Sequence, residues 1–153
     1  MLIMIQLWWN NNIQLSPNIF ISCGGSAKND LIPKLKELIL SLGMKPIIAE
    51  EEPNYNLSPQ DKVRTFINLS NAGIAVITAE DLQSNGEFHP CANVVHEIGL
   101  MQENSNIRGR IIYMKENRLN LPSNLQVSYI SFNRKNFESS YVELIKNIKA
   151  FVS

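Results

Sequence analysis

The sequence predicts a three-layer α/β/α fold in which a five-stranded parallel β-sheet lies between two layers of helices. Short apolar runs alternate with longer amphipathic stretches after Pro17, and this alternation is typical of repeated β-α units. The run GIAVIT (residues 73–78) is apolar throughout, as expected for a strand in the middle of a parallel sheet that is covered on both faces.

The first β-α unit begins at residues 18–22 (NIFIS), a β-branched and aromatic run that predicts a strand and ends in the turn sequence CGGS. The stretch 29–43 then places leucine and isoleucine at helical spacing, which predicts a helix. Asp30 is its expected N-cap, and Gly43 lies just past its end. A second short strand is expected at residues 45–50 (KPIIAE).

The later elements follow the same alternation. The sequence predicts helices over 60–71, 91–100 and 138–152, and strands over 73–78, 110–114 and 127–132. The predicted order is therefore β-α-β-α-β-α-β-loop-β-α. This order requires a parallel sheet with helices on both faces.

Three polar segments follow predicted strands, at residues 23–26 (CGGS), 51–56 (EEPNYN) and 80–90 (EDLQSNGEFHP). In open parallel sheets, ligands bind outside the carboxyl ends of the strands. We therefore expect these segments to gather at one edge and to form the binding site.

Composition and charge exclude several functions. Fourteen basic and fourteen acidic residues cancel, so nothing favours a nucleic acid or an anionic membrane surface as a partner. The apolar start MLIMIQLWW is too short to span a bilayer and lacks the features of a signal peptide. Two separate cysteines without metal-binding spacing predict a reduced, cytoplasmic setting and no metal site. Residues 1–16 are either a loose N-terminal strand or a linker from an upstream domain, and we favour the linker. We expect residues 17–153 to be one folded domain.

The turn CGGS has two interpretations. The backbone at Gly24 and Gly25 could approach a phosphate, or the glycines could form a plain tight turn, since the sequence is neither GxGxxG nor a Walker loop. Cys23 could be a nucleophile with His89 or His96 as its base. No partner that would orient a histidine is visible, which favours a buried neutral thiol.

Polar side chains after the second and third strands are also ambiguous. The run EEEPN (residues 50–54) either belongs to a solvated loop or supplies one carboxylate, such as Glu51, or Asn54 to hydrogen-bond the hydroxyls of a ligand. Asp81 has the same two interpretations and could also cap a turn.

Glu97 is the strongest catalytic candidate. It lies one position off the apolar face formed by Val94, Ile98 and Met101, in a helix that begins directly after the third polar segment. Asn93 precedes it by one helical turn, so both side chains should point along one stripe toward the strand ends. A single carboxylate at that place could stabilise an oxocarbenium-like ribosyl cation and accept hydrogen bonds from the ribose hydroxyls. No second acid is needed when the leaving group is already cationic, as nicotinamide is in NAD⁺.

Three segments resemble a known family. They are IFISCGG, the stretch KPIIAEEEPNYNLSPQDKVRTFINLSNAGIAVITAED, and NVVHEIGL. From about Asn18 to Phe151 the chain resembles a bacterial TIR domain, specifically the TIR-like predicted nucleotide-binding group of antiphage defence effectors of the CBASS and Pycsar type. Two positions depart from the family pattern: Cys23 stands where a histidine is frequent, and Cys91 where an arginine is frequent.

The resemblance implies a flavodoxin-like fold, the TIR fold, and the activity of an NAD⁺ glycohydrolase that depletes NAD⁺ in antiphage defence. It implies that Glu97 is the catalytic residue of an enzyme with NAD⁺ as substrate and no separate cofactor. It also implies TIR–TIR self-association, often driven by an attached sensor domain.

We expect Asn93 to orient Glu97 or the ribose, and the remaining candidates to bind substrate. Ser22, Gly24 and Gly25 would line the diphosphate or ribose side, with Glu51 and Asn54 on the opposing loop. Two alternatives remain open. One is an N-glycosidase similar to the nucleoside 2-deoxyribosyltransferases, which would spare NAD⁺. The other is a non-catalytic TIR module that binds a nucleotide or a partner.

Overall fold

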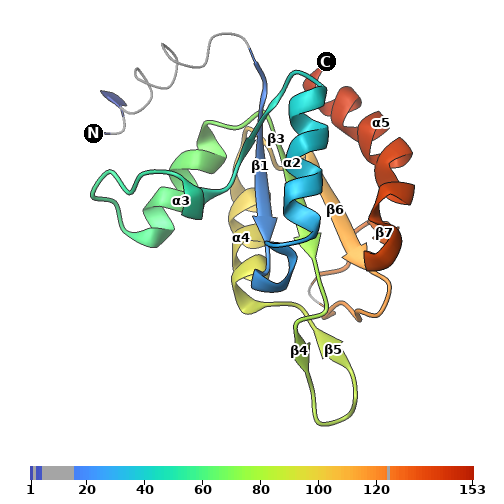
Figure 1. The fold of residues 1–153 in the computed structure, drawn as a ribbon. Coiled ribbons are helices and arrows are strands. Elements are labelled where there is room, and N and C mark those ends of the chain that lie inside the picture. Colours follow the sequence, from blue (N-terminus) through green and yellow to red (C-terminus); the bar gives the residue numbers. More distant parts are fainter. Residues whose placement is uncertain (2, 5–15, 124) are drawn as a thin grey trace.

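The computed structural model describes residues 1, 3–4, 16–123 and 125–153. Its central sheet is formed by β1 (Asn18–Cys23), β2 (Lys45–Ile47), β3 (Ala72–Ile77), β6 (Ile111–Glu116) and β7 (Ile130–Phe132). The spatial order is β2-β1-β3-β6-β7, and every neighbouring pair is parallel (Figure 1). This is the flavodoxin-like order of a doubly wound sheet, so the predicted fold is confirmed.

Different helix pairs cover the two faces of the sheet. The helices are α2 (Leu31–Ser41), α3 (Pro59–Asn68), α4 (Ala92–Glu103) and α5 (Tyr141–Val152). Helices α2 and α5 pack on one face, and α3 and α4 pack on the other (Figure 1). Successive strand residues point to opposite faces. Ile74 and Val76 therefore pack in the core beneath α2 and α5, and Ala75 and Ile77 pack in the core beneath α3 and α4.

The predicted helix ends are present. The Asp30 carboxylate accepts a hydrogen bond from the Leu31 N–H at the start of α2. Gly43 follows the helix with a φ of 76°, a conformation that glycine adopts without steric cost. At the start of α3, the Ser58 hydroxyl accepts a hydrogen bond from the Asp61 N–H, and Pro59 occupies the first helical position.

The structure differs from the sequence prediction in several elements. The strand expected over 127–132 begins at Ile130, and α3 and α4 end at Asn68 and Glu103 instead of at 71 and 100. The polar segment 80–90 contains a small antiparallel hairpin, β4 (Asp81–Leu82) and β5 (Phe88–His89), whose turn is closed by Gly86 at a φ of 84°. The second strand ends at Ile47, and a 3₁₀ turn, η2 (Ala49–Glu51), follows it. The last α-helix begins at Tyr141 rather than 138, because a kinked 3₁₀ segment, η3 (Arg134–Ser140), precedes it.

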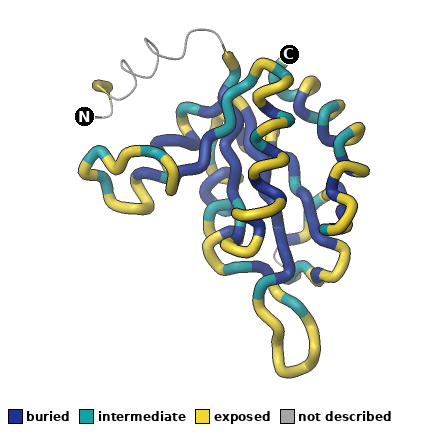
Figure 2. Tube along the Cα trace, viewed as in Figure 1, coloured by how far each residue is buried: buried dark blue, intermediate teal, exposed yellow. Residues whose placement is uncertain are grey.

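The carboxyl edge of the sheet carries the exposed connections. The turn η1 (Gly25–Ala27) follows β1 there, and the β4–β5 hairpin projects beyond the end of β3 (Figures 1 and 2). The buried strands end where this exposed surface begins (Figure 2). The expected linker over residues 1–16 falls largely outside the described residues. In the part of the chain that the structure describes, no helix has the length and apolar character needed to cross a membrane.

Candidate functional site

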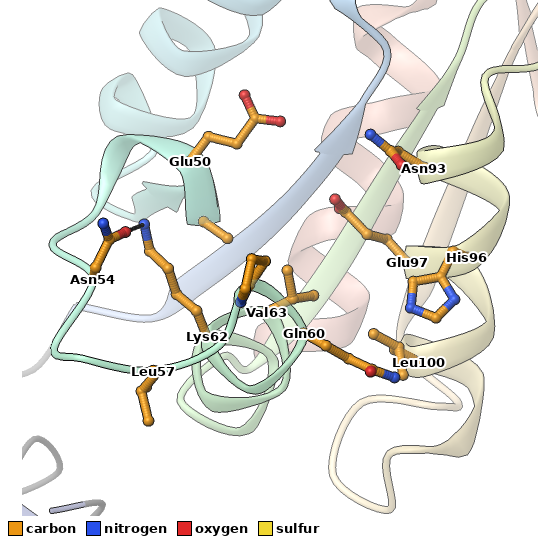
Figure 3. A pocket seen from close by; sticks show the side chains of 12 residues that line it. Glu50, Asn54, Leu57, Gln60, Lys62, Val63, Asn93, His96, Glu97 and Leu100 are labelled. Carbon is orange, nitrogen blue, oxygen red and sulfur yellow. Dashed lines mark hydrogen bonds between the residues drawn. The ribbon is translucent and has the colours of Figure 1, made fainter.

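A cavity of about 700 Å³ opens beside the carboxyl ends of β1 and β2 (Figure 3). Its walls come from η2 and the loop after it, from α3 and from α4. Its volume lies within the range of small-molecule sites, and its polar lining includes Glu50, Asn54, Lys62, Asn93 and Glu97. Asn54, Asn93 and Glu97 are therefore brought together as the sequence predicts.

The packing of α4 places Glu97 at the cavity wall. Val94, Ile98 and Met101 are buried against the sheet, so the residue before Ile98 sits at the edge of the apolar face. Asn93 lies one turn earlier on the same helix and lines the same cavity (Figure 3).

Gly73 on β3 determines how closely α4 approaches the sheet. A Cβ atom at this position would lie 2.7 Å from the Met101 sulfur, which is well inside van der Waals contact. A side chain at residue 73 would therefore require the buried Met101 side chain to move. Gly73 thus lets Met101, one turn after Glu97 on α4, pack directly on β3.

Glu97 is a carboxyl group with a strongly perturbed acidity. Its pKa is raised from 4.5 to about 7, mainly by burial and to a smaller extent by the nearby charge of Glu50. The Ser22 hydroxyl and the Lys28 ammonium act in the opposite direction. Ser22 is fully buried at the end of β1, and its hydroxyl makes no hydrogen bond of normal geometry to any described residue. A raised carboxyl pKa in a cavity is characteristic of functional sites.

Cys23 lies beside Glu97 at the end of β1. Burial, followed by the charge of Glu97, raises the pKa of its thiol to about 12. The thiol therefore stays protonated near neutral pH, which favours a buried neutral cysteine over a nucleophile.

The glycines of the first turn pack against Glu80. Its carboxylate accepts hydrogen bonds from the Ser26 N–H (3.1 Å), the Ser26 hydroxyl (2.7 Å) and the Thr78 hydroxyl (2.8 Å). A Cβ atom on Gly24 would lie 2.1 Å from the Glu80 oxygen, whereas nothing lies within 4 Å of one on Gly25. Because the Ser26 N–H already donates to a carboxylate, the structure favours a plain tight turn here over a phosphate site.

Six of the sequence-predicted site residues do not line the cavity: Ser22, Cys23, Gly24 and Gly25 at and just after the end of β1, and Glu51 and Asp81. Glu51 is exposed and pairs with Lys36 of α2 at 2.6 Å. Asp81 is exposed in the β4–β5 hairpin, where its backbone lies opposite that of His89 in the antiparallel ladder. Glu50, the residue before Glu51, lines the cavity instead.

Sequence reasoning missed Lys62, which lines the cavity from α3, and considered His96 only as a base for Cys23, although His96 lines the cavity from α4. The sequence does contain a feature that marks Lys62. It precedes Thr65 and Phe66 by three and four residues, so all three lie on the buried face of the helix. A lysine on the buried stripe of an amphipathic helix is unusual. Among the described residues, no group of three or more His, Cys, Asp and Glu side chains is arranged to hold a metal ion.

Comparisons with known proteins agree with this architecture. Residues 18–134 match the family model described as "CAP12/Pycsar effector protein, TIR domain". No curated protein matches the chain. Among solved structures, the chain is similar to the metal-soaked Flv1 flavodiiron core from Synechocystis sp. PCC6803, with a TM-score of 0.53 and 10% identity. The alignment covers 96% of this chain but only 38% of that protein, and at this identity the similarity concerns the fold alone.

Proposed function

Because the chain belongs to the TIR domain family of CAP12/Pycsar effector proteins, we propose that it is an NAD⁺ glycohydrolase in which Glu97 is the catalytic carboxylate. The observation that carries this proposal is the partly buried Glu97 carboxyl, which lines a cavity at the carboxyl edge of the sheet with a pKa of about 7. Asn93, one turn away, supports it as a neighbour that orients Glu97 or the ribose. The role of the enzyme would be to deplete NAD⁺ in antiphage defence.

In the proposed reaction, the bond between ribose C1′ and the nicotinamide nitrogen breaks, and its electron pair neutralises the pyridinium ring. The ribosyl group becomes an oxocarbenium-like cation that the ionised Glu97 stabilises, and the carboxylate oxygens accept hydrogen bonds from the ribose hydroxyls. Water then adds to C1′ and releases a proton, which gives ADP-ribose. The cationic nicotinamide ring of the substrate would favour the ionised form of Glu97 on binding, because a nearby opposite charge lowers the pKa of a carboxyl group.

We also propose that the enzyme acts in the cytoplasm and reaches full activity through self-association, under the control of a sensor domain. These proposals rest on the family alone. They determine how the assay is designed, since dilute protein would not assemble.

The test is nicotinamide release from NAD⁺ by concentrated protein in the presence of a crowding agent, followed by chromatography. We expect Glu97→Gln to lower the rate by at least about 10²–10³-fold, because it keeps the shape and removes the charge. Glu103→Gln is the matched control, since it removes an exposed carboxylate from the same helix. Equal rates for the wild type and Glu97→Gln would contradict the assignment.

A further inference from the structure

Lys62 places a poorly neutralised cation in the wall of the cavity. The residue is only 7% exposed, and its ammonium donates a hydrogen bond to the Asn54 side-chain oxygen at 2.9 Å. An ammonium carries three N–H donors. The ion pairs found among the described residues do not include Lys62.

Two other lysines near the site differ from Lys62 in this respect. Lys28 pairs with Glu50, and Lys36 pairs with Glu51. Both of these lysines are considerably more exposed than Lys62. Burying a cation without a carboxylate partner is costly, and an anionic ligand in the cavity would remove that cost.

The charges of the cavity are separated in space. Glu97 projects from α4 and Lys62 rises from α3 on the other side of the cavity (Figure 3). Lys62 is the one lysine or arginine among the described residues that line it. A nicotinamide nucleotide has the complementary arrangement, because its base is cationic and its phosphate is anionic.

The turn after β1 offers a weaker alternative for an anion. Its Ser26 N–H and hydroxyl already donate to Glu80, and a second anion beside that carboxylate would be repelled. Among the described residues, no carboxylate lies within ion-pair distance of Lys62. The two observations together place the anion-binding end of the cavity at α3.

We infer that Lys62 is the phosphate-binding residue of this cavity and determines the preference for NAD⁺ over a nicotinamide nucleoside that has no phosphate. This inference rests on the proposed reaction for its choice of base, while the phosphate contact itself rests on the burial and partners of Lys62. Asn54 acts as the positioning residue that holds the ammonium in the cavity wall.

The first experiment compares NAD⁺ with nicotinamide riboside, which contains the same scissile bond but no phosphate. We expect the preference for NAD⁺, measured as the ratio of kcat/KM values, to fall about 10–100-fold in Lys62→Met, mainly through KM for NAD⁺. Lys62→Arg should recover most of the preference. Lys36→Met, which removes a lysine outside the cavity, should leave it unchanged.

A merely structural role for Lys62 would give a different result. If the lysine only holds the loop through Asn54, its replacement would lower the cleavage of both substrates by the same factor. An unchanged ratio in Lys62→Met would therefore overturn the inference and leave the proposed reaction standing.

The second experiment measures binding of inorganic pyrophosphate by calorimetry and needs no catalysis. We expect about tenfold or greater weakening in Lys62→Met and near-wild-type affinity in Lys62→Arg, with circular dichroism confirming that both variants fold. Equal affinity of the wild type and Lys62→Met would overturn the inference. Lys62-dependent binding by a protein that cleaves neither substrate would support the phosphate site while the proposed reaction fails.

Discussion

Replacing Glu97 by glutamine should stabilise the protein, and the gain should grow as the pH rises. Burial raises the pKa of this carboxyl from 4.5 to about 7 in the folded protein. Each pKa unit corresponds to about 1.4 kcal/mol, so ionising Glu97 costs the folded state about 3 kcal/mol relative to the unfolded chain. Solvent that reaches the partly buried carboxyl reduces this to about 2–3 kcal/mol.

The sign follows from which state holds the proton. Below about pH 4.5 the carboxyl is protonated in both states, so its contribution to stability is complete. Between about pH 4.5 and 7 only the unfolded chain loses the proton, and the free energy of unfolding of the wild type falls. Above about pH 7 both states are ionised, and the loss stays constant. Glutamine cannot ionise, so Glu97→Gln avoids this loss.

Urea unfolding followed by circular dichroism at about pH 4.5 and about pH 8.5 measures the effect. The measured quantity is the difference in free energy of unfolding between Glu97→Gln and the wild type. Any fixed cost of exchanging a carboxyl for an amide is the same at both pH values, so this difference should be about 2 kcal/mol larger at the higher pH. Glu103→Gln, on the exposed side of the same helix, should change by less than about 0.5 kcal/mol. The same pH dependence in Glu97→Gln and in the wild type would refute the reasoning from burial.

Two further predictions concern the pH dependence of activity and the first turn. The kcat/KM for NAD⁺ should rise about tenfold per pH unit below a midpoint near 7, since the proposed reaction needs Glu97 in its ionised form. A flat profile between about pH 5.5 and 8.5 would contradict the proposed catalytic role of Glu97. Gly24→Ala should lower the free energy of unfolding by about 1–3 kcal/mol, because its Cβ would meet Glu80 at 2.1 Å. Gly25→Ala has open space and should change it by less than about 0.5 kcal/mol, so equal thermal stability of the two variants would contradict the steric argument.

The layers of the fold could be predicted because the signal is local. The fully buried strand β3 is a continuous apolar run, and the α2 N-cap at Asp30 and end at Gly43 are ordinary helix signals. The β4–β5 hairpin was missed because each of its strands has only two residues, and its sequence contains no alternating apolar pattern.

The candidate site was only partly predictable, because its remaining residues depend on side-chain direction. Asn54, Asn93 and Glu97 follow strands that end at one edge, so topology alone brings them together. In the run of glutamates, the 3₁₀ turn η2 rotates each residue by about 120° from the last, which sends Glu50 toward the cavity and Glu51 toward α2. No sequence pattern predicts that Glu50 and Glu51 point in these different directions.

A substitution at Gly73 would act on the proposed catalytic carboxyl from outside the cavity. This glycine is absent from the lining of the cavity, yet a side chain there would force Met101, or the whole helix, away from the sheet. A genetic screen for inactive variants would be expected to recover this position beside the polar residues of the cavity. For redesign, residue 73 offers a way to shift the Glu97 carboxyl while every residue that lines the cavity keeps its identity.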